Sequence, residues 1–359
     1  MAHTISSLDQ ERLEAVVLCP TSGWDVCRRR IQAEHVQFVA YPHDFARAID
    51  TIHESAIDIL YHRQIGTDAF NYFLPFTRCA PIQCTGWGTH GTTGLASVDY
   101  YLSSTRIEID SAGAHYTEKL HQFQDAFPTC PSRVPIPEKG DREQFGLPSA
   151  GAIYFCPQRI EKYHPDFDPL LKGVLESDPS GCVVTLGADS AHMAAQLRAR
   201  WSRTIGETLL QRVHMLRRQR TRNYYALLSL ANVVLDSPHY SASLTGFDAF
   251  SFGIPIVTLP GVYNVERYAQ GLYRQMGIEE LIATNVEEYV ALAVRLGTDS
   301  DYRRHWHEEI LRRSDILFES RTAIREFERF FANCWERRDS LLESSSEKRN
   351  FAEDVKSLP

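Results

Sequence analysis

The residues best suited to chemistry lie in the segment 235–261, with the sequence LDSPHYSASLTGFDAFSFGIPIVTLPG. Hydroxyl-rich residues follow Asp236, and the spacing of the apolar residues after them predicts a helix that begins between Ser243 and Thr245 and ends at Gly253. The first N–H groups of a helix have no acceptor within the helix and bind anions such as phosphate. One turn further along, the Asp248 carboxylate could reach a ribose hydroxyl. The segment therefore predicts one wall of an active site.

A simpler interpretation of the same residues stays open at this point. Ser243 or Thr245 would then act only as the N-cap of the helix, with a side chain that accepts a hydrogen bond from a backbone N–H. Asp248 would be only a favourable acidic charge in the first turn. These residues alone do not separate a capped structural helix from an anion site.

The elements around this segment predict parallel sheets. The apolar run 231–235 is typical of a strand that is buried on both faces of such a sheet, and ligands of open α/β sheets gather at its carboxyl edge. Strand and helix patterns alternate over 13–61 and again over 151–261. Between them, residues 127–150 are rich in proline, glycine and charge. We therefore expect an α/β protein with an N-terminal domain at 1–127, a linker at 128–150, a C-terminal domain at 151–340, a polar tail at 341–359, and a cleft between the two domains.

A glycine-rich loop, GWGTHGTTG, occupies residues 86–94 and contains a formal G-x-G-x-x-G at Gly86, Gly88 and Gly91. A dinucleotide-binding fingerprint needs a long helix directly after its glycines. Here the next strand-like run, 98–103, follows within a few residues, so we do not predict a dinucleotide site. The loop either lets backbone approach a ligand or is a plain cluster of turns.

Composition excludes several classes of protein. The 38 basic and 46 acidic residues give a formal net charge of −8, which argues against a general nucleic-acid or membrane-surface binder. No stretch approaches the ~18 apolar residues of a membrane span, and residues 1–14 lack the apolar core of a signal peptide. The eight cysteines contain no CxxC pair, so we predict neither a disulfide framework nor a zinc site. We expect a cytoplasmic protein without membrane insertion, nucleic-acid partner or bound metal.

Several motifs in one order carry a resemblance to a known family. Four segments are similar to segments of bacterial O-GlcNAc-transferase-like proteins: APIQCTGWGTHGTTGLASVDYYLSS at 80–104, KYHP at 162–165, the central segment 235–261, and GLYRQMGIEELIATNVEEYVALAVRLGTD at 271–299. Each motif alone is weakly specific, but the ordered set extends over roughly 13–334. On this basis the chain is identified as a member of glycosyltransferase family 41.

The resemblance implies a GT-B fold of two Rossmann-like domains and an inverting, metal-independent glycosyltransferase. It implies a UDP-sugar donor, with UDP-GlcNAc as the family default, a protein or peptide acceptor, and no required cofactor. Lys162 would neutralise the donor diphosphate as the catalytic charge. The other implied donor-site residues are Ser243, Leu244 and Thr245 for the phosphates, Asp248 for the ribose, Tyr224 near the uracil, and Gly88, Gly91 and Thr92 near the sugar. Arg218, in the basic run 217–222, is a further candidate for phosphate contact on its charge alone.

The sequence also departs from the family pattern. Where relatives commonly have glycine, then histidine or asparagine, then threonine before the helix, this chain has Ala242, Ser243 and Leu244. The family's opening strand and its histidine should precede Ile5, so we expect an N-terminally incomplete first domain without tetratricopeptide repeats. The alternative function is therefore a catalytically weak or inactive nucleotide-sugar-binding module. A GT-B epimerase is disfavoured because the motif order follows the transferases.

Overall fold

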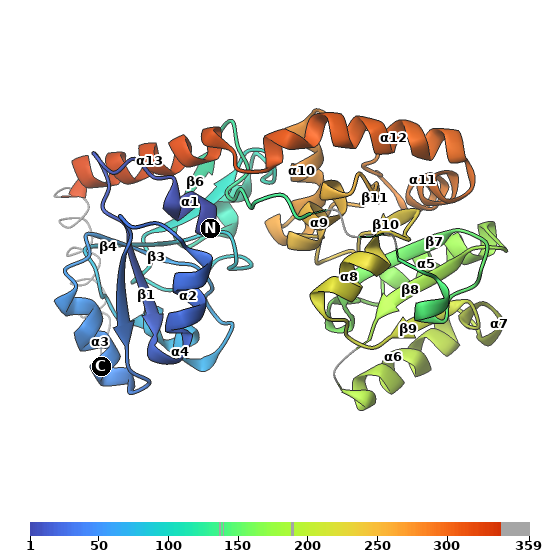
Figure 1. The fold of residues 1–359 in the computed structure, drawn as a ribbon, viewed down its shortest axis with the longest axis horizontal. Coiled ribbons are helices and arrows are strands. Elements are labelled where there is room, and N and C mark those ends of the chain that lie inside the picture. Colours follow the sequence, from blue (N-terminus) through green and yellow to red (C-terminus); the bar gives the residue numbers. More distant parts are fainter. Residues whose placement is uncertain (136–137, 139, 188–189, 339–359) are drawn as a thin grey trace, which may run out of the picture. The chain divides into compact units, whose positions relative to one another are not determined.

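The computed structural model describes residues 1–135, 138, 140–187 and 190–338, and the predicted tail at 341–359 lies outside this range. The chain forms two compact units. Of the described residues, unit 1 contains 1–105, 110–131 and 319–338, and unit 2 contains those within 106–109 and 132–318 (Figure 1). The change from unit 1 to unit 2 after residue 131 falls inside the predicted linker. No helix in the described part of the chain combines the length and the hydropathy needed to cross a bilayer.

Unit 1 contains a four-stranded sheet in the order β3-β4-β5-β6 and a separate pair, β1-β2, with every paired strand parallel. A cavity of about 770 Å³ lies between β1 and β3, which are not hydrogen-bonded to each other in the described residues. The elements are α1 Ala2–Ser6, β1 Val16–Pro20, η1 Thr21–Gly23, α2 Trp24–Arg30, β2 Gln37–Tyr41, α3 Phe45–Glu54, β3 Ile59–His62, α4 Ala69–Phe73, η2 Leu74–Phe76, β4 Ile82–Thr85, β5 Tyr100–Ser104, η3 Ala112–His115, β6 Lys119–Phe123 and α13 Arg321–Glu336.

Unit 2 contains a five-stranded parallel sheet in the order β11-β10-β7-β8-β9. Its central strands are buried, as the apolar runs in the sequence predict. The elements are η4 Glu143–Phe145, β7 Ile153–Arg159, η5 Ile160–Lys162, α5 Phe167–Ser177, β8 Cys182–Leu186, α6 Ala191–Thr204, α7 Glu207–Leu210, β9 Val213–Leu216, α8 Thr221–Leu228, β10 Val233–Leu235, α9 Leu244–Ser251, β11 Ile256–Val257, η6 Asn264–Glu266, α10 Tyr268–Met276, α11 Val286–Thr298, α12 Ser300–Arg313 and η7 Ser314–Leu317. The prediction of an α/β chain with two parallel-sheet halves is confirmed.

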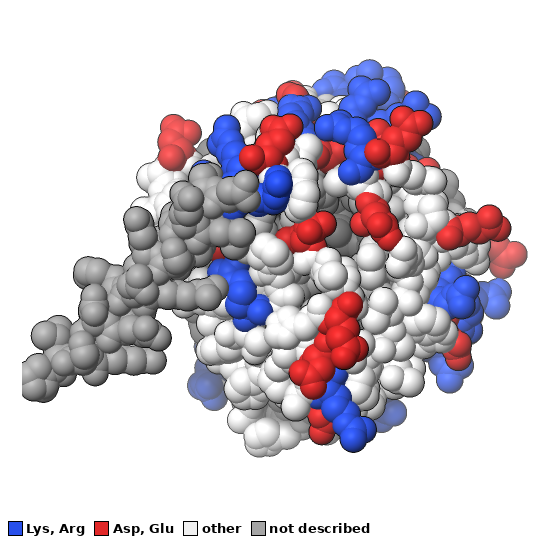
Figure 2. All heavy atoms as spheres, turned by 90° about the vertical axis from the view of Figure 1, so that its left-hand side faces the viewer, with Lys and Arg blue, Asp and Glu red and all other residues white. Residues whose placement is uncertain are grey.

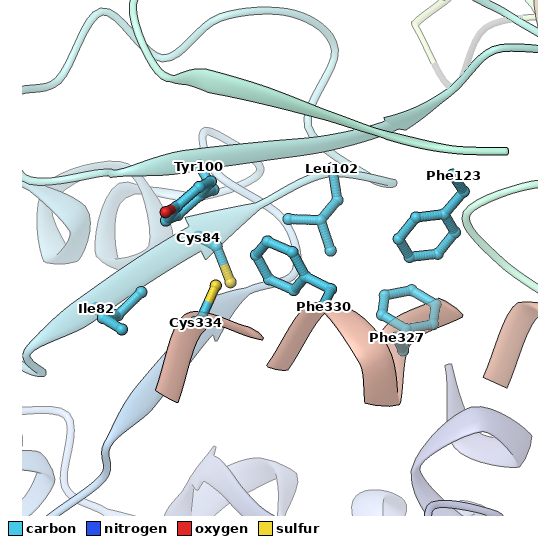
Figure 3. Close-up of a cluster of buried hydrophobic side chains, with 8 residues drawn as sticks. All are labelled: Ile82, Cys84, Tyr100, Leu102, Phe123, Phe327, Phe330 and Cys334. Carbon is cyan, nitrogen blue, oxygen red and sulfur yellow. The ribbon is translucent and has the colours of Figure 1, made fainter. Parts of the chain in front are cut away.

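The last helix corrects the predicted domain limits. Residues 151–340 were expected to form one domain, but α13 belongs to unit 1. Its buried side chains Phe327, Phe330 and Cys334 pack against β4, β5 and β6, with the Phe327 ring centroid 4.8 Å from that of Phe123 (Figure 3). Burial of one such phenylalanine contributes about 1.5–3 kcal/mol. The apolar stripe of α13 is therefore what returns the end of the chain to the first sheet.

Charged side chains are distributed without one dominant sign on the face of the molecule shown in Figure 2, where acidic and basic residues alternate with uncharged surface. The visible part of this face therefore presents no extended field of a single sign to a charged partner.

Candidate functional site

The order of the strands in unit 2 marks one place for a ligand. The chain leaves β7 towards β8 and β9, and then returns to β10 on the other side of β7 before continuing to β11. The connections that follow β7 and β10 therefore run in opposite directions from neighbouring strands. In open α/β sheets ligands bind outside the carboxyl ends of the strands at such a switch point. The segment after β7 carries Lys162, and the segment after β10 is the hydroxyl-rich loop.

Asp236 fixes the shape of the loop after β10. The side chain is 2 % exposed and accepts hydrogen bonds from the Ser241 hydroxyl at 2.6 Å, the Ala242 backbone N–H at 2.6 Å and the Thr258 hydroxyl at 2.7 Å. Burial raises the pKa of Asp236 to about 6, although these donors oppose the rise. The sequence identified Asp236 only as the end of a strand. Its tertiary role is to hold the loop that leads into α9.

Lys162 lies at the end of η5, directly after β7. Its Nζ is 3.6 Å from the centroid of the Tyr240 ring, and no described carboxylate forms an ion pair with it. Burial, with a smaller contribution from the charge of Arg159, lowers the pKa of Lys162 to about 8. An ammonium over an aromatic face is stabilised without losing its charge. Tyr240 thus positions a cation that can still act on an anion, a contact that no feature of the sequence predicted.

Helix α9 begins within the predicted range. Ser243 is its N-cap, but the Ser243 side chain makes no capping hydrogen bond, and the Leu244 side chain is 52 % exposed. Gly253 follows the helix with a φ of +66°, as predicted for a glycine after a helix C-terminus. A Cβ at Gly253 would lie 2.6 Å from Nδ1 of His307. The limits of the helix are confirmed, and Ser243 and Thr245 are half-buried at its N-terminus.

The α8 and α9 helices bring Tyr224 and Tyr225 beside Asp248. Burial raises the pKa of Asp248 to about 6, and the two phenolic groups oppose this rise. The Tyr224 hydroxyl is buried and meets no partner at full hydrogen-bond geometry among the described residues, but it interacts with the Asp248 carboxylate. Burial, followed by the charge of Asp248, raises the pKa of Tyr224. In this pair the carboxylate can accept a hydrogen bond from a polar ligand, and the hydroxyl can donate one.

The remaining predicted residues divide between the units. Arg218 is exposed on the connection between β9 and α8 in unit 2. Gly88, Gly91 and Thr92 lie in unit 1, so the structure does not group them with Lys162. The two glycines have φ of +104° and +125°, and the Thr92 hydroxyl donates to Glu118 at 2.8 Å. The loop runs from β4 to β5 without a helix, which agrees with the rejection of a dinucleotide fingerprint.

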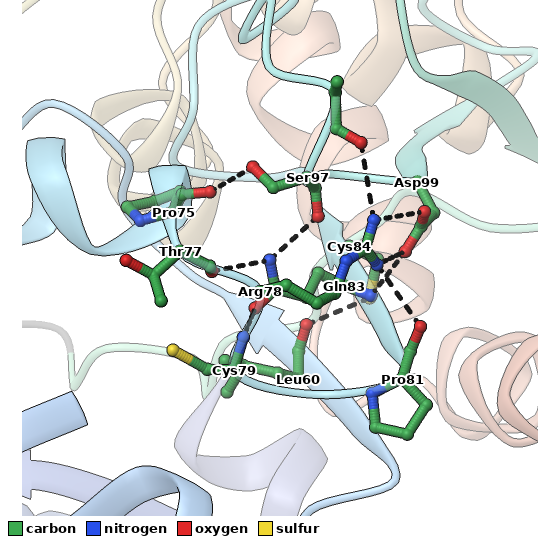
Figure 4. A network of polar contacts seen from close by, with 11 residues as sticks. Leu60, Pro75, Thr77, Arg78, Cys79, Pro81, Gln83, Cys84, Ser97 and Asp99 are labelled. Atoms are coloured by element: carbon green, nitrogen blue, oxygen red, sulfur yellow. Dashed lines mark hydrogen bonds and ion pairs between the residues drawn. The ribbon is translucent and has the colours of Figure 1, made fainter. Parts of the chain in front are cut away.

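Gln83 of the APIQC motif ties the segment before β4 to the segment that follows the glycine-rich loop (Figure 4). Its side chain is fully buried, accepts from the Cys79 N–H at 3.0 Å, and donates to the carbonyls of Thr77 at 3.2 Å and Ser97 at 2.8 Å. The Gln83 backbone N–H donates to Asp99 at 2.8 Å. The glutamine of the motif is thus a structural clamp rather than a ligand contact.

Comparisons with known proteins converge on one family. The model of Glycosyl transferase family 41 matches residues 129–327. A probable UDP-N-acetylglucosamine--peptide N-acetylglucosaminyltransferase, SPINDLY, from Petunia hybrida is 25% identical over 72% of this chain and 28% of its own length. A second probable UDP-N-acetylglucosamine--peptide N-acetylglucosaminyltransferase, SEC from Arabidopsis thaliana, is 26% identical over 86% of this chain and 32% of its own length. The chain therefore spans about a third or less of these relatives.

Solved structures agree on the fold. An O-GlcNAc transferase from Thermobaculum terrenum superposes with a TM-score of 0.81 at 22% identity, over 96% of this chain and 65% of that one. HepE from Anabaena, in complex with UDP and glucose, superposes with a TM-score of 0.59 at 11% identity, over 92% and 94% of the two chains. At these identities the likeness concerns the fold.

Proposed function

The chain belongs to glycosyl transferase family 41 and has the GT-B fold, and on this basis we propose that it moves GlcNAc from UDP-GlcNAc to a side chain of a protein or peptide. The reaction is an in-line displacement with inversion and without a metal ion. The acceptor oxygen forms the new bond to the anomeric carbon, the bond from that carbon to UDP breaks, and UDP leaves with the electron pair. The acceptor hydroxyl gives its proton to the departing phosphate oxygen of UDP or to water.

The donor would bind at the switch point between β7 and β10. The diphosphate would lie between the Lys162 ammonium and the N-terminus of α9, where the charge and the helix N–H groups favour an anion. The ribose would bond to Asp248, and the uracil would lie near Tyr224, whose buried hydroxyl interacts with Asp248. Arg218 would be a further phosphate contact. The role of Gly88, Gly91 and Thr92, which belong to unit 1, stays a prediction from the resemblance.

Catalysis in this proposal is electrostatic. Negative charge grows on UDP as the glycosidic bond breaks, so the attraction to a fixed ammonium is stronger in the transition state than in the ground state. Lys162 meets this need because Tyr240 holds it in place and no described carboxylate lies within ion-pair distance of its Nζ, although Glu161 and Asp236 act on it from further away. This placement of a lysine without a direct ion pair at the switch point is the observation that carries the proposal.

The experiment is isothermal titration of the chain with UDP, UDP-GlcNAc and UDP-glucose, together with assays of donor hydrolysis and of transfer to peptides. We expect saturable binding of UDP, preference for UDP-GlcNAc over UDP-glucose, and turnover of the donor. Absence of UDP binding at millimolar concentration contradicts the proposal.

A second candidate, a nucleotide-sugar-binding module with weak or no turnover, is favoured by one observation. Leu244 presents an exposed apolar side chain at the first residue of α9, where the phosphates would lie. Leu244→Thr restores a hydroxyl there. UDP binding without turnover in the wild type, and turnover in the Leu244→Thr variant, would select the module. We also propose a cytoplasmic location, which cell fractionation tests.

A further inference from the structure

A compact group of ligating side chains lies on the surface of unit 2, beside the switch point. Nδ1 or Nε2 of His164 and His239 and a carboxylate oxygen of Asp166 all lie within 4.8 Å of one another. Asp166 Oδ2 is 2.8 Å from His239 Nε2 and 3.3 Å from His164 Nδ1, and the two imidazole centroids are 4.4 Å apart. His164 and Asp166 come from the segment between η5 and α5, whereas His239 comes from the loop after β10. Two segments far apart in sequence therefore bring these groups together.

A buried carboxylate fixes the orientation of His239. Glu266 accepts from His239 Nδ1 at 2.7 Å, and it also accepts the backbone N–H groups of Val262 at 2.7 Å and Tyr263 at 2.9 Å. Its side chain is 9 % exposed. A Cβ at Gly261 would lie 2.1 Å from Glu266 Oε2, so only glycine leaves space for this arrangement. With Nδ1–H directed at Glu266, Nε2 is the nitrogen of His239 that faces Asp166, and it would bind an ion in place of its proton.

We propose that His164, Asp166 and His239 bind one divalent transition-metal ion, with Zn²⁺ as the best fit. Two imidazoles and one carboxylate are a typical ligand set for zinc, and a metal-bound histidine usually donates its other N–H to a carboxylate, as His239 does to Glu266. Zinc–ligand bonds of about 2.0–2.1 Å at tetrahedral angles separate the ligand atoms by about 3.3 Å. The two Asp166 separations of 2.8 and 3.3 Å are close to that value, and the two histidine nitrogens, which lie within 4.8 Å of each other, would approach by rotation of the exposed His164 side chain.

The site has an entry path and a position for a further ligand. The side chains of His164, Asp166 and His239 are 50 %, 63 % and 46 % exposed. An ion can therefore reach them from solvent, and a water or an anionic oxygen can complete the coordination. The Asp166 backbone N–H donates a long hydrogen bond to His164 Nδ1 at 3.3 Å, which His164 gives up if it binds the ion through this nitrogen.

The competing explanation is a plain ion-pair cluster in which a charged His239 bridges Asp166 and Glu266. Such an exposed pair contributes little to stability. The explanation differs from the proposal in its consequences, because it requires no metal and gives His164 no role. Metal binding by the free chain is measured without nucleotide or acceptor, so its outcome is independent of the proposed transferase activity.

The test is equilibrium dialysis of the whole chain against Zn²⁺, followed by metal analysis and by competition with a chelator of known affinity. We expect one zinc per chain at this site. His164→Ala and His239→Ala should each weaken it at least ~10–100-fold, the range known for losing even an indirect partner of a metal ligand. His192→Ala, which changes an exposed histidine on α6, is the matched control and should bind as the wild type does.

Substitution with Co²⁺ separates this site from the cysteines, since thiolate ligands add a charge-transfer band that imidazole and carboxylate do not. We expect a tetrahedral Co²⁺ spectrum without that band, lost in His239→Ala. Circular dichroism of each variant checks that it is folded. The proposal is overturned if the folded wild type takes up no stoichiometric zinc, if the two histidine variants bind as the wild type does, or if the spectrum shows thiolate ligands.

Discussion

Replacement of Lys162 by methionine is the sharpest test of the proposed donor site. Methionine keeps much of the apolar stem and removes the charge whose Nζ lies 3.6 Å from the centroid of Tyr240. At an effective dielectric constant of 20, a unit charge about 4 Å from an ammonium interacts with it by about 4 kcal/mol. Only the part that grows in the transition state accelerates the reaction. By comparison with loss of one oxyanion donor, we expect a loss of about 2–4 kcal/mol of transition-state stabilisation, which lowers kcat/KM roughly 30-fold to 1000-fold.

The fold should tolerate this change. Loss of the cation–π contact costs about 0.5–2 kcal/mol, and the half-buried ammonium no longer has to be desolvated, which offsets part of that cost. Thermal unfolding of Lys162→Met should therefore stay within a few degrees of the wild type. Lys172→Met is the matched control, because Lys172 is a partly exposed lysine on α5 and makes only an i,i+4 pair with Glu176 at 3.9 Å. The control should retain both activity and UDP affinity.

The assays are donor turnover under single-turnover conditions and titration with UDP at two ionic strengths. UDP affinity should fall in Lys162→Met, and the difference from the wild type should be larger at low salt, because screening weakens the lost attraction. If Lys162→Met leaves turnover and UDP binding unchanged while Asp248→Ala abolishes them, the reasoning is refuted. The diphosphate would then lie at the N-terminus of α9 or beside Arg218.

Three further predictions concern other parts of the chain. Burial raises the pKa of Asp248 to about 6, so UDP affinity measured by calorimetry should rise as the pH is raised through 6 and the carboxylate forms. In the unliganded protein, the stability of the wild type relative to Asp248→Asn should fall between about pH 4 and pH 7, because the folded state binds the extra proton in that range. Equal pH profiles of stability for the wild type and Asp248→Asn contradict this prediction. Phe327→Ala should destabilise the chain to urea by about 3–5 kcal/mol through a cavity under α13, and Phe331→Ala, at a half-buried position, by less. Gln83→Leu should cost at least ~2 kcal/mol, because it leaves buried backbone groups without partners, and a loss below about 0.5 kcal/mol in the same urea titration would show that water replaces the amide.

Features that depend on neighbouring residues could be read from the sequence. The strand predicted within the apolar run 231–235 is β10, which begins two residues later and ends at the predicted residue. The start of α9 could be predicted because hydroxyl residues favour helix N-termini, and its end because glycine favours the left-handed backbone conformation that follows a helix. Strand β6 was not predicted, because a five-residue segment that is buried only at its last residue shows little alternation of apolar and polar residues.

Features that depend on residues far apart in sequence came only from the tertiary structure. The stripe on α13 indicated a buried face, but nothing local showed that its partners are β4, β5 and β6. The sequence placed Lys162 after the first strand of unit 2 and left its partner unknown, and the pairing of β7 with β10 is what brings Tyr240 beneath it. The same pairing joins His164 and Asp166 to His239. Hydrophobic periodicity and turn preferences act over a few residues and determine the elements, whereas strand order is set by packing of the whole sheet, and it alone decides which loops share a site.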